Sequence, residues 1–113
     1  MKYSDGQRIN KIYENAVRLH EYITNNNIKR EDLLTNIPLQ WLVTTPLYNI
    51  GEHVYYLSDE YKEAHSEISW SMVSGLRHRL VHDYDYDGTN WNIIVEVVFE
   101  ELPILIEELR KLV

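Results

Sequence analysis

The spacing of the apolar residues is the feature that most constrains the fold of this chain, because it follows the period of a helix. In the last third of the sequence apolar side chains recur every third or fourth residue, at Trp91, Ile94, Val95, Val98, Leu102, Leu105, Ile106, Leu109 and Leu112. This period gathers side chains on one face of a helix, whereas a strand requires strict alternation. No alternating run of strand length occurs in the 113 residues. The sequence therefore predicts an all-α fold.

Helix-breaking residues divide this pattern into four main helices and one short extra helix. Asparagines at 25–27 are suited to closing the first helix, because asparagine tolerates the left-handed backbone of a helix end. Pro38 suits the first turn of the second long helix, and Pro46 falls inside it. Ser69 and Thr89 are the expected N-caps of the last two long helices. The expected segments are 4–25, a short helix near 30–34, 38–63, 69–82 and 89–112, forming an up-and-down bundle in a single domain, residues 1–113.

Composition restricts where the protein works and what it binds. Eighteen acidic residues against eleven basic ones give a net charge of −7. Since affinity for nucleic acid comes mainly from clustered Lys and Arg, any RNA contact must be local. The chain has no cysteine, its N-terminus lacks the apolar core of a signal peptide, and its apolar runs are too short for a membrane span. We therefore expect a cytoplasmic protein without a membrane partner.

The run of residues 75–84, Gly-Leu-Arg-His-Arg-Leu-Val-His-Asp-Tyr, collects two arginines, two histidines and a tyrosine in this acidic chain. Arg77 offers a planar cation suited to phosphate, and His82 can exchange a proton near neutral pH. Together they indicate phosphodiester chemistry. Five residues separate them by about 140° around a helix, which fits the wall of a groove between two copies of the chain. The structural alternative is that Arg77 pairs with a surface carboxylate and His82 caps the helix end.

Two metal sites are weaker alternatives for the same region. Asp83, Asp85, Asp87 and Gly88 reproduce the opening of an EF-hand loop, but the bidentate Glu that completes such a loop would fall at Ile94. His78 and His82 lie four residues apart and would share one helical face, as zinc-binding histidines do, but no third ligand is apparent. The sequence therefore predicts no metal site.

The surrounding motifs add a family resemblance. Arg77, His82 and Tyr84 give the pattern of Arg, four residues, His, one residue and Tyr. In order around it stand Ile50-Gly51-Glu52, Leu57-Ser58-Asp59-Glu60-Tyr61, Ile68-Ser69-Trp70, Trp91 and the segment from Glu101 to Leu109. From about residue 50 onward the chain resembles the HepT family of HEPN-domain ribonuclease toxins. The resemblance implies a helical RNase that needs no metal or other cofactor and acts on RNA but not DNA. It also implies a homodimer with a shared cleft and an MNT-type nucleotidyltransferase antitoxin as partner.

The resemblance also assigns roles to residues. It makes Arg77 and His82 the catalytic pair and Tyr84 the tyrosine that the antitoxin modifies with AMP, although Tyr84 could equally lie over the helix end as a hydrophobic lid. The supporting or RNA-binding residues would be Glu52, His78, Arg79 and Asp83. Two positions depart from the family pattern: His78 replaces a small polar residue such as Asn, and Asn36 replaces an expected acidic residue. The alternative function is a non-catalytic HEPN module that binds a nucleotidyltransferase or a nucleotide.

The remaining aromatic residues and one glycine have structural explanations. Trp41, Trp70 and Trp91 lie on apolar stripes and are expected to be core or dimer contacts. Gly51 falls inside an expected helix, where glycine costs about 1 kcal/mol relative to alanine. Its presence beside Glu52 therefore predicts a close approach between two helices.

Overall fold

The computed structural model describes residues 2–81 and 89–113, and every regular element in this part of the chain is a helix. The elements are α1 (Asp5–Asn25), α2 (Arg30–Thr35), α3 (Ile37–Tyr55), α4 (Asp59–Ala64), α5 (Trp70–Val81), α6 (Trp91–Glu96), the π-helical turn η2 (Val97–Glu101) and α7 (Leu102–Arg110). Because α6, η2 and α7 form one continuous helix, the described chain has four long helices, as predicted. It has two short helices, α2 and α4, where the sequence predicted one.

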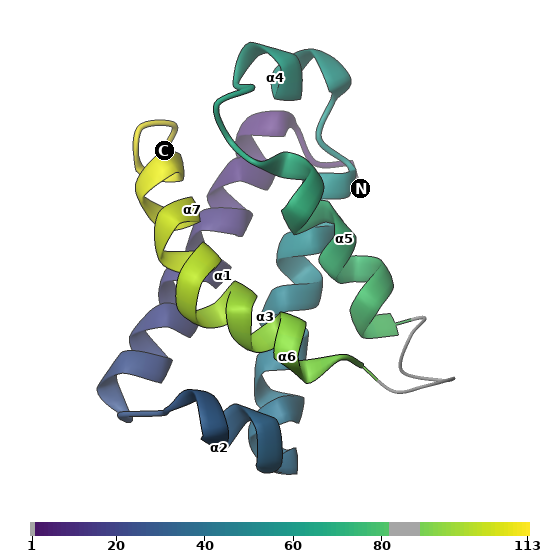
Figure 1. Cartoon of the computed structure of the whole chain (residues 1–113). Coiled ribbons are helices and arrows are strands. Elements are labelled where there is room, and N and C mark those ends of the chain that lie inside the picture. The colour runs from purple at the N-terminus through teal and green to yellow at the C-terminus, as the bar shows by residue number, and fades with distance from the viewer. Residues whose placement is uncertain (1, 82–88) are drawn as a thin grey trace.

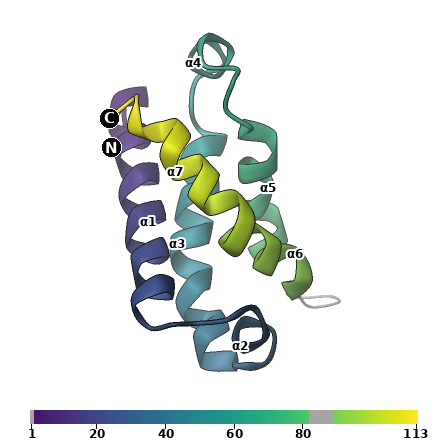
Figure 2. The ribbon, with the colours of Figure 1, turned by 60° about the vertical axis from the view of Figure 1, so that its left-hand side comes forward.

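Helix α3 lies at the centre of the bundle and packs against α1 on one side and α5 on the other (Figure 1). The α6–α7 helix runs obliquely across this layer and packs on α1, while α2 and α4 lie at opposite ends of the molecule (Figure 2). Apolar side chains from all the long helices form one core, and no polar or charged side chain of the described residues is buried in it. In the described part of the chain, no helix combines the length and the apolarity that crossing a membrane requires.

The helix ends follow the local signals of the sequence. Ser4 caps α1 through a capping box with Gln7, and Asn27 takes a left-handed φ of 52° just after that helix, as the asparagine run predicted. Asn36 is the N-cap of α3, because its side-chain oxygen accepts a hydrogen bond from the Leu39 N–H at 3.0 Å. This capping role is one that an acidic residue at the same position could also perform.

Two expected boundaries were wrong, and the last helix contains a turn that the sequence did not predict. Helix α3 ends at Tyr55 and does not continue to residue 63, because Ser58 caps a new helix by accepting the Tyr61 N–H. The last helix starts after Asn90, whose side chain accepts the Asn92 N–H, and not after Thr89. Near the middle of this last helix, the backbone hydrogen bonds change to the wider π-helical pattern of η2, shortly before Pro103. Proline has no N–H to donate, so Pro103 removes one backbone hydrogen bond from the helix at this point.

The three tryptophans have different environments. Trp70 is buried, and Trp91 is half-buried against the core. Trp41 on α3 is 65% exposed, so its assignment to the core was wrong. A dimer contact remains the prediction for this residue.

Candidate active site

The site is organised around a close approach between α3 and α5 at Gly51. A Cβ atom on Gly51 would lie 2.7 Å from the backbone nitrogen of Arg77 and 3.3 Å from the Cβ atoms of Arg77 and Leu76. Only glycine lets the two helix backbones come so near. The predicted close approach is therefore confirmed, and the neighbour that it positions is Arg77.

Glu52, the residue after Gly51, binds Arg77 directly. The Arg77 Nε–H donates a hydrogen bond of 2.6 Å to Glu52 Oε2, and the two side chains are 33% and 30% exposed. This hydrogen bond raises the pKa of Arg77 above its usual value, so the guanidinium stays charged. The structure thus brings together two of the predicted site residues. It also contains the pairing of Arg77 with a carboxylate that the structural alternative predicted.

Three tyrosines of the α3 region surround the same guanidinium. Its carbon lies 4.5 Å from the ring centroid of Tyr55 and 5.9 Å from that of Tyr56, both within cation–π range. Hydrogen bonding to Tyr48 contributes to the raised pKa of Arg77. Sequence reasoning missed these tyrosines as site residues. The signal was present, because Tyr48, Glu52 and Tyr55 are spaced by four and three and so share one helix face.

The other predicted site residues are placed only in part. His78 and Arg79 are exposed on α5, rotated away from Arg77 because consecutive helical residues point in different directions. His82, Asp83 and Tyr84 lie outside the described residues, as do the remaining members of the expected acidic loop, Asp85, Asp87 and Gly88. Within residues 2–81 and 89–113, no three His, Asp or Glu side chains gather as a metal site would require. Both metal alternatives involve residues beyond that part.

The described residues on either side of positions 82–88 lie near one face of α3. Leu80 and Thr89 line a hollow of about 230 Å³ together with Trp41 and Thr44 of α3. Trp41 precedes Tyr48 by seven residues, so it belongs to the same helix face as Tyr48 and Glu52. This face of α3 therefore runs from the exposed Trp41 to the Arg77 ion pair.

The chain is similar to a family of known proteins over most of its length. The model of the family described as "Ribonuclease HepT-like" matches residues 12–112, so the chain belongs to the HepT-like ribonuclease family. A protein of Caldanaerobacter subterraneus subsp. tengcongensis named "Putative RNase TTE0752" is 33% identical over 85 residues, which are 75% of this chain and 74% of that protein. The "Probable ribonuclease HepT" of Thermococcus cleftensis is 32% identical over 114 residues, covering 98% of this chain and all of that protein. No solved structure gives a significant match.

Proposed function

We propose that this chain is a single-domain endoribonuclease that cleaves RNA without a metal ion, with Arg77 and His82 as its catalytic residues. The observation that carries the proposal is the way Arg77 is held. Its Nε–H is bound by Glu52, its guanidinium lies over the Tyr55 ring, and its backbone touches Gly51. A guanidinium has five N–H donors, so the terminal nitrogens retain donors for a phosphate. An arginine whose orientation is fixed by three contacts can stabilise the negative charge that develops in the transition state.

RNA supplies its own nucleophile for this reaction, which DNA lacks. The 2′-hydroxyl loses its proton to a base and attacks the neighbouring phosphorus, and the 5′-oxygen of the next nucleotide leaves with a proton from an acid. The products are a 2′,3′-cyclic phosphate and a free 5′-hydroxyl. In the proposal His82 carries out proton transfer, which typically contributes ~10²–10⁴ in rate. Arg77 stabilises the negative charge of the phosphorane, and His78 and Arg79 with Asp83 form the adjacent RNA-contacting surface.

The test is cleavage of single-stranded RNA in the presence of EDTA by the wild type and by the variants Arg77→Ala and His82→Ala. We expect wild-type cleavage that leaves a 2′,3′-cyclic phosphate, and a loss of at least about 100-fold in either variant. Circular dichroism would verify that the variants keep their helical content. Wild-type and His82→Ala proteins of equal activity would refute the assignment. No cleavage by the wild type would favour the non-catalytic module.

We further propose that the protein works as a homodimer in which two copies of the α3 face form the cleft. Trp41 is 65% exposed at one end of this face, and Ile37 and Leu42 are 56% and 40% exposed beside it on α3. Large exposed apolar side chains that cluster in this way are typical of interfaces. We expect Trp41→Ala to shift the protein toward monomer in light scattering at micromolar concentration and to lower its activity on dilution. Ile104→Ala is the control, because Ile104 is 55% exposed on α7; equal effects of both variants would contradict this interface.

The proposal also includes a nucleotidyltransferase antitoxin that transfers AMP to Tyr84. An added phosphate and purine near Arg77 would oppose its positive charge and occupy the space that RNA needs. Co-expression with a neighbouring nucleotidyltransferase should add the mass of AMP to the peptide that carries Tyr84. Tyr84→Phe should fold, remain unmodified and stay active. Silencing of Tyr84→Phe by AMP transfer would show that the modified residue is another one.

A further inference from the structure

A second arginine, Arg8 of α1, lies beside the candidate active site. Its Nη1 is 3.2 Å from Nδ1 of His53, and its guanidinium carbon is 5.5 Å from the ring centroid of Tyr3. The same carbon is 5.2 Å from the ring centroid of Tyr56. Because Tyr56 also lies within cation–π range of Arg77, one tyrosine ring joins the two cations. We call Tyr3, Arg8, His53 and Tyr56 the Arg8 strip.

The Arg8 guanidinium is held by a hydrogen bond to His53 and by two aromatic rings, and not by a salt bridge to a described carboxylate. The two other arginines that contact aromatic rings are paired with carboxylates: Arg77 with Glu52, and Arg30 with Glu96 and Glu100. Arg8 forms no salt bridge with any described residue. Its hydrogen-bond partner His53 is neutral near pH 7, because burial and the nearby Arg8 charge lower the pKa of this histidine. A neutral ring accepts the Arg8 N–H and leaves the positive charge available to an anion.

The carboxylate of Asp5 interacts with the Arg8 charge, which helps to lower the Asp5 pKa after the larger effect of Ser58, but its hydrogen bonds go to Ser58. Asp5, one helical turn earlier on α1, accepts two hydrogen bonds from Ser58, one from the backbone N–H at 3.0 Å and one from the hydroxyl at 2.6 Å. The rings beside Arg8 remain accessible, since Tyr3 is 39% and Tyr56 is 50% exposed. A cation next to exposed rings is the combination that proteins use to bind a single nucleotide of an unpaired strand, with the phosphate on the cation and the base on a ring or guanidinium plane.

We propose that the Arg8 strip binds one nucleotide of single-stranded RNA next to the cleaved phosphate, with its phosphate on Arg8 and its base stacked at Tyr56. This inference rests on the proposed ribonuclease function for the choice of RNA. Double-stranded RNA does not fit, because its bases are stacked on each other and cannot reach a tyrosine ring. Local binding of this kind is also what a chain of net charge −7 requires, since the protein as a whole repels RNA.

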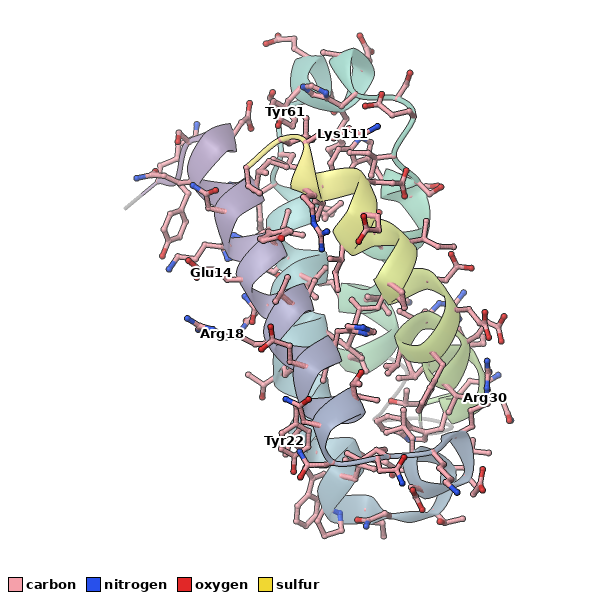
Figure 3. The ribbon with its side chains drawn as sticks, turned by 90° about the vertical axis from the view of Figure 1, so that its left-hand side faces the viewer. Glu14, Arg18, Tyr22, Arg30, Tyr61 and Lys111 are labelled. Carbon is pink, nitrogen blue, oxygen red and sulfur yellow. The ribbon has the colours of Figure 1, made fainter. Side chains whose placement is uncertain are left out.

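Binding can be measured apart from cleavage with a single-stranded RNA that is methylated at every 2′-hydroxyl and so lacks the nucleophile. Fluorescence anisotropy would give its Kd over a range of salt concentrations for the wild type, Arg8→Gln and Arg18→Gln. Arg18 is the matched control, because it is an exposed arginine that projects outward from the same helix, between Glu14 and Tyr22 (Figure 3). Loss of one phosphate contact should reduce the slope of log K against log salt by about 0.7 in Arg8→Gln only.

The stacking contact has its own test. Tyr56→Leu should weaken RNA binding by about fivefold or more, whereas Tyr56→Phe, which keeps the ring, should bind like the wild type. If Arg8→Gln and Arg18→Gln have the same salt slope, or if Tyr56→Leu binds like Tyr56→Phe, the Arg8 strip is not an RNA subsite. It is also refuted if Arg8→Gln binds RNA normally but loses affinity for a partner protein, which would make the strip a protein-binding surface.

Cleavage assays separate this inference from the proposed function. A dinucleotide contains only the cleaved linkage, so Arg8→Gln should cleave it at the wild-type rate while cleaving longer RNA more slowly. Wild-type cleavage with no effect of Arg8→Gln on any substrate would refute the subsite and leave the ribonuclease proposal intact. RNA binding that depends on Arg8 in a protein that cleaves nothing would refute the ribonuclease proposal and support the subsite.

Discussion

The substitution Gly51→Ala tests whether the contact between α3 and α5 sets the position of Arg77. The added methyl group would lie 2.7 Å from the Arg77 backbone nitrogen, which is part of a helix and cannot rotate away like the end of a side chain. Ordinary van der Waals contact begins at 3.4 Å, so α5 must move by about 0.7 Å near Arg77. Arg77 would move with its helix, while Glu52 remains on α3.

The expected energies separate stability from activity. Overpacking a core contact typically costs about 1–3 kcal/mol, and replacing a helical glycine by alanine recovers about 1 kcal/mol of helix propensity. The free energy of unfolding should therefore fall by no more than about 2 kcal/mol. A misplacement near 1 Å in a catalytic arrangement can reduce the rate about 100-fold, so we expect RNA cleavage to fall about 10- to 100-fold. Activity should thus decrease far more than the folded fraction of the protein.

Urea unfolding and RNA cleavage measured on the same preparations would check this expectation. The control is Gly75→Ala in the facing helix α5, because a Cβ atom there meets no described heavy atom within 4 Å. This variant should keep wild-type activity and gain up to about 1 kcal/mol of stability. A Gly51→Ala protein with the activity of the wild type and the stability gain of Gly75→Ala would refute the argument that this contact positions Arg77.

Two further predictions concern ion pairing and pH. Glu52→Gln should lower kcat roughly tenfold because Arg77 is less firmly oriented, and it should not raise KM, since removing a negative charge does not weaken RNA binding. Steady-state kinetics would measure both constants, and a rise in KM with unchanged kcat would contradict this prediction. Asp5→Ala should cost about 1–2 kcal/mol at pH 7 by breaking the hydrogen bonds to Ser58. Because these bonds lower the pKa of Asp5, that stabilisation exists above the unfolded pKa near 3.8 and disappears as the pH falls through the folded value. The free energy of unfolding, measured with urea, should therefore differ less between wild type and Asp5→Ala at pH 3 than at pH 7. An equal difference at the two pH values would refute this role of Asp5.

The helical fold could be predicted from sequence because its signals are local. The helical spacing of apolar residues, the N-cap residues and the asparagine run are all signals that act within a few residues. They correctly placed α1, α2 and the start of α3. The end of α3 was not predictable in this way. Residues 38–63 keep a helical pattern, but the chain breaks at residues 56–58, where Ser58 binds Asp5 from the far end of the sequence. The N-cap signal of Ser58 was present in the sequence, but nothing local showed that its contact with Asp5, 53 residues away, would interrupt the helical pattern there.

The candidate site has a part that the structure tests and a part that stays a prediction. Gly51 correctly indicated the helix contact, whereas the chemistry predicted from residues 75–84 remains a prediction. The surroundings of Arg77 could not be predicted as easily, because Glu52 is 25 residues away and Arg8 belongs to another helix. Trp41 illustrates the same limit: its spacing fits an apolar stripe, but spacing alone does not reveal whether a stripe faces the core or a second molecule.

The geometry around Gly51 gives a physical reason for the order of residues in this part of α3. Gly51 removes the side chain that would separate the helices, and the next residue, Glu52, then reaches Arg77 with a hydrogen bond of 2.6 Å. One turn further on, Tyr55 covers the guanidinium, and Tyr56 extends the contact to Arg8. A change at Glu52 or Tyr55 should therefore affect Arg77 first and the fold second, since neither side chain belongs to the buried core. This separation makes activity, measured against stability, the informative readout for the whole segment.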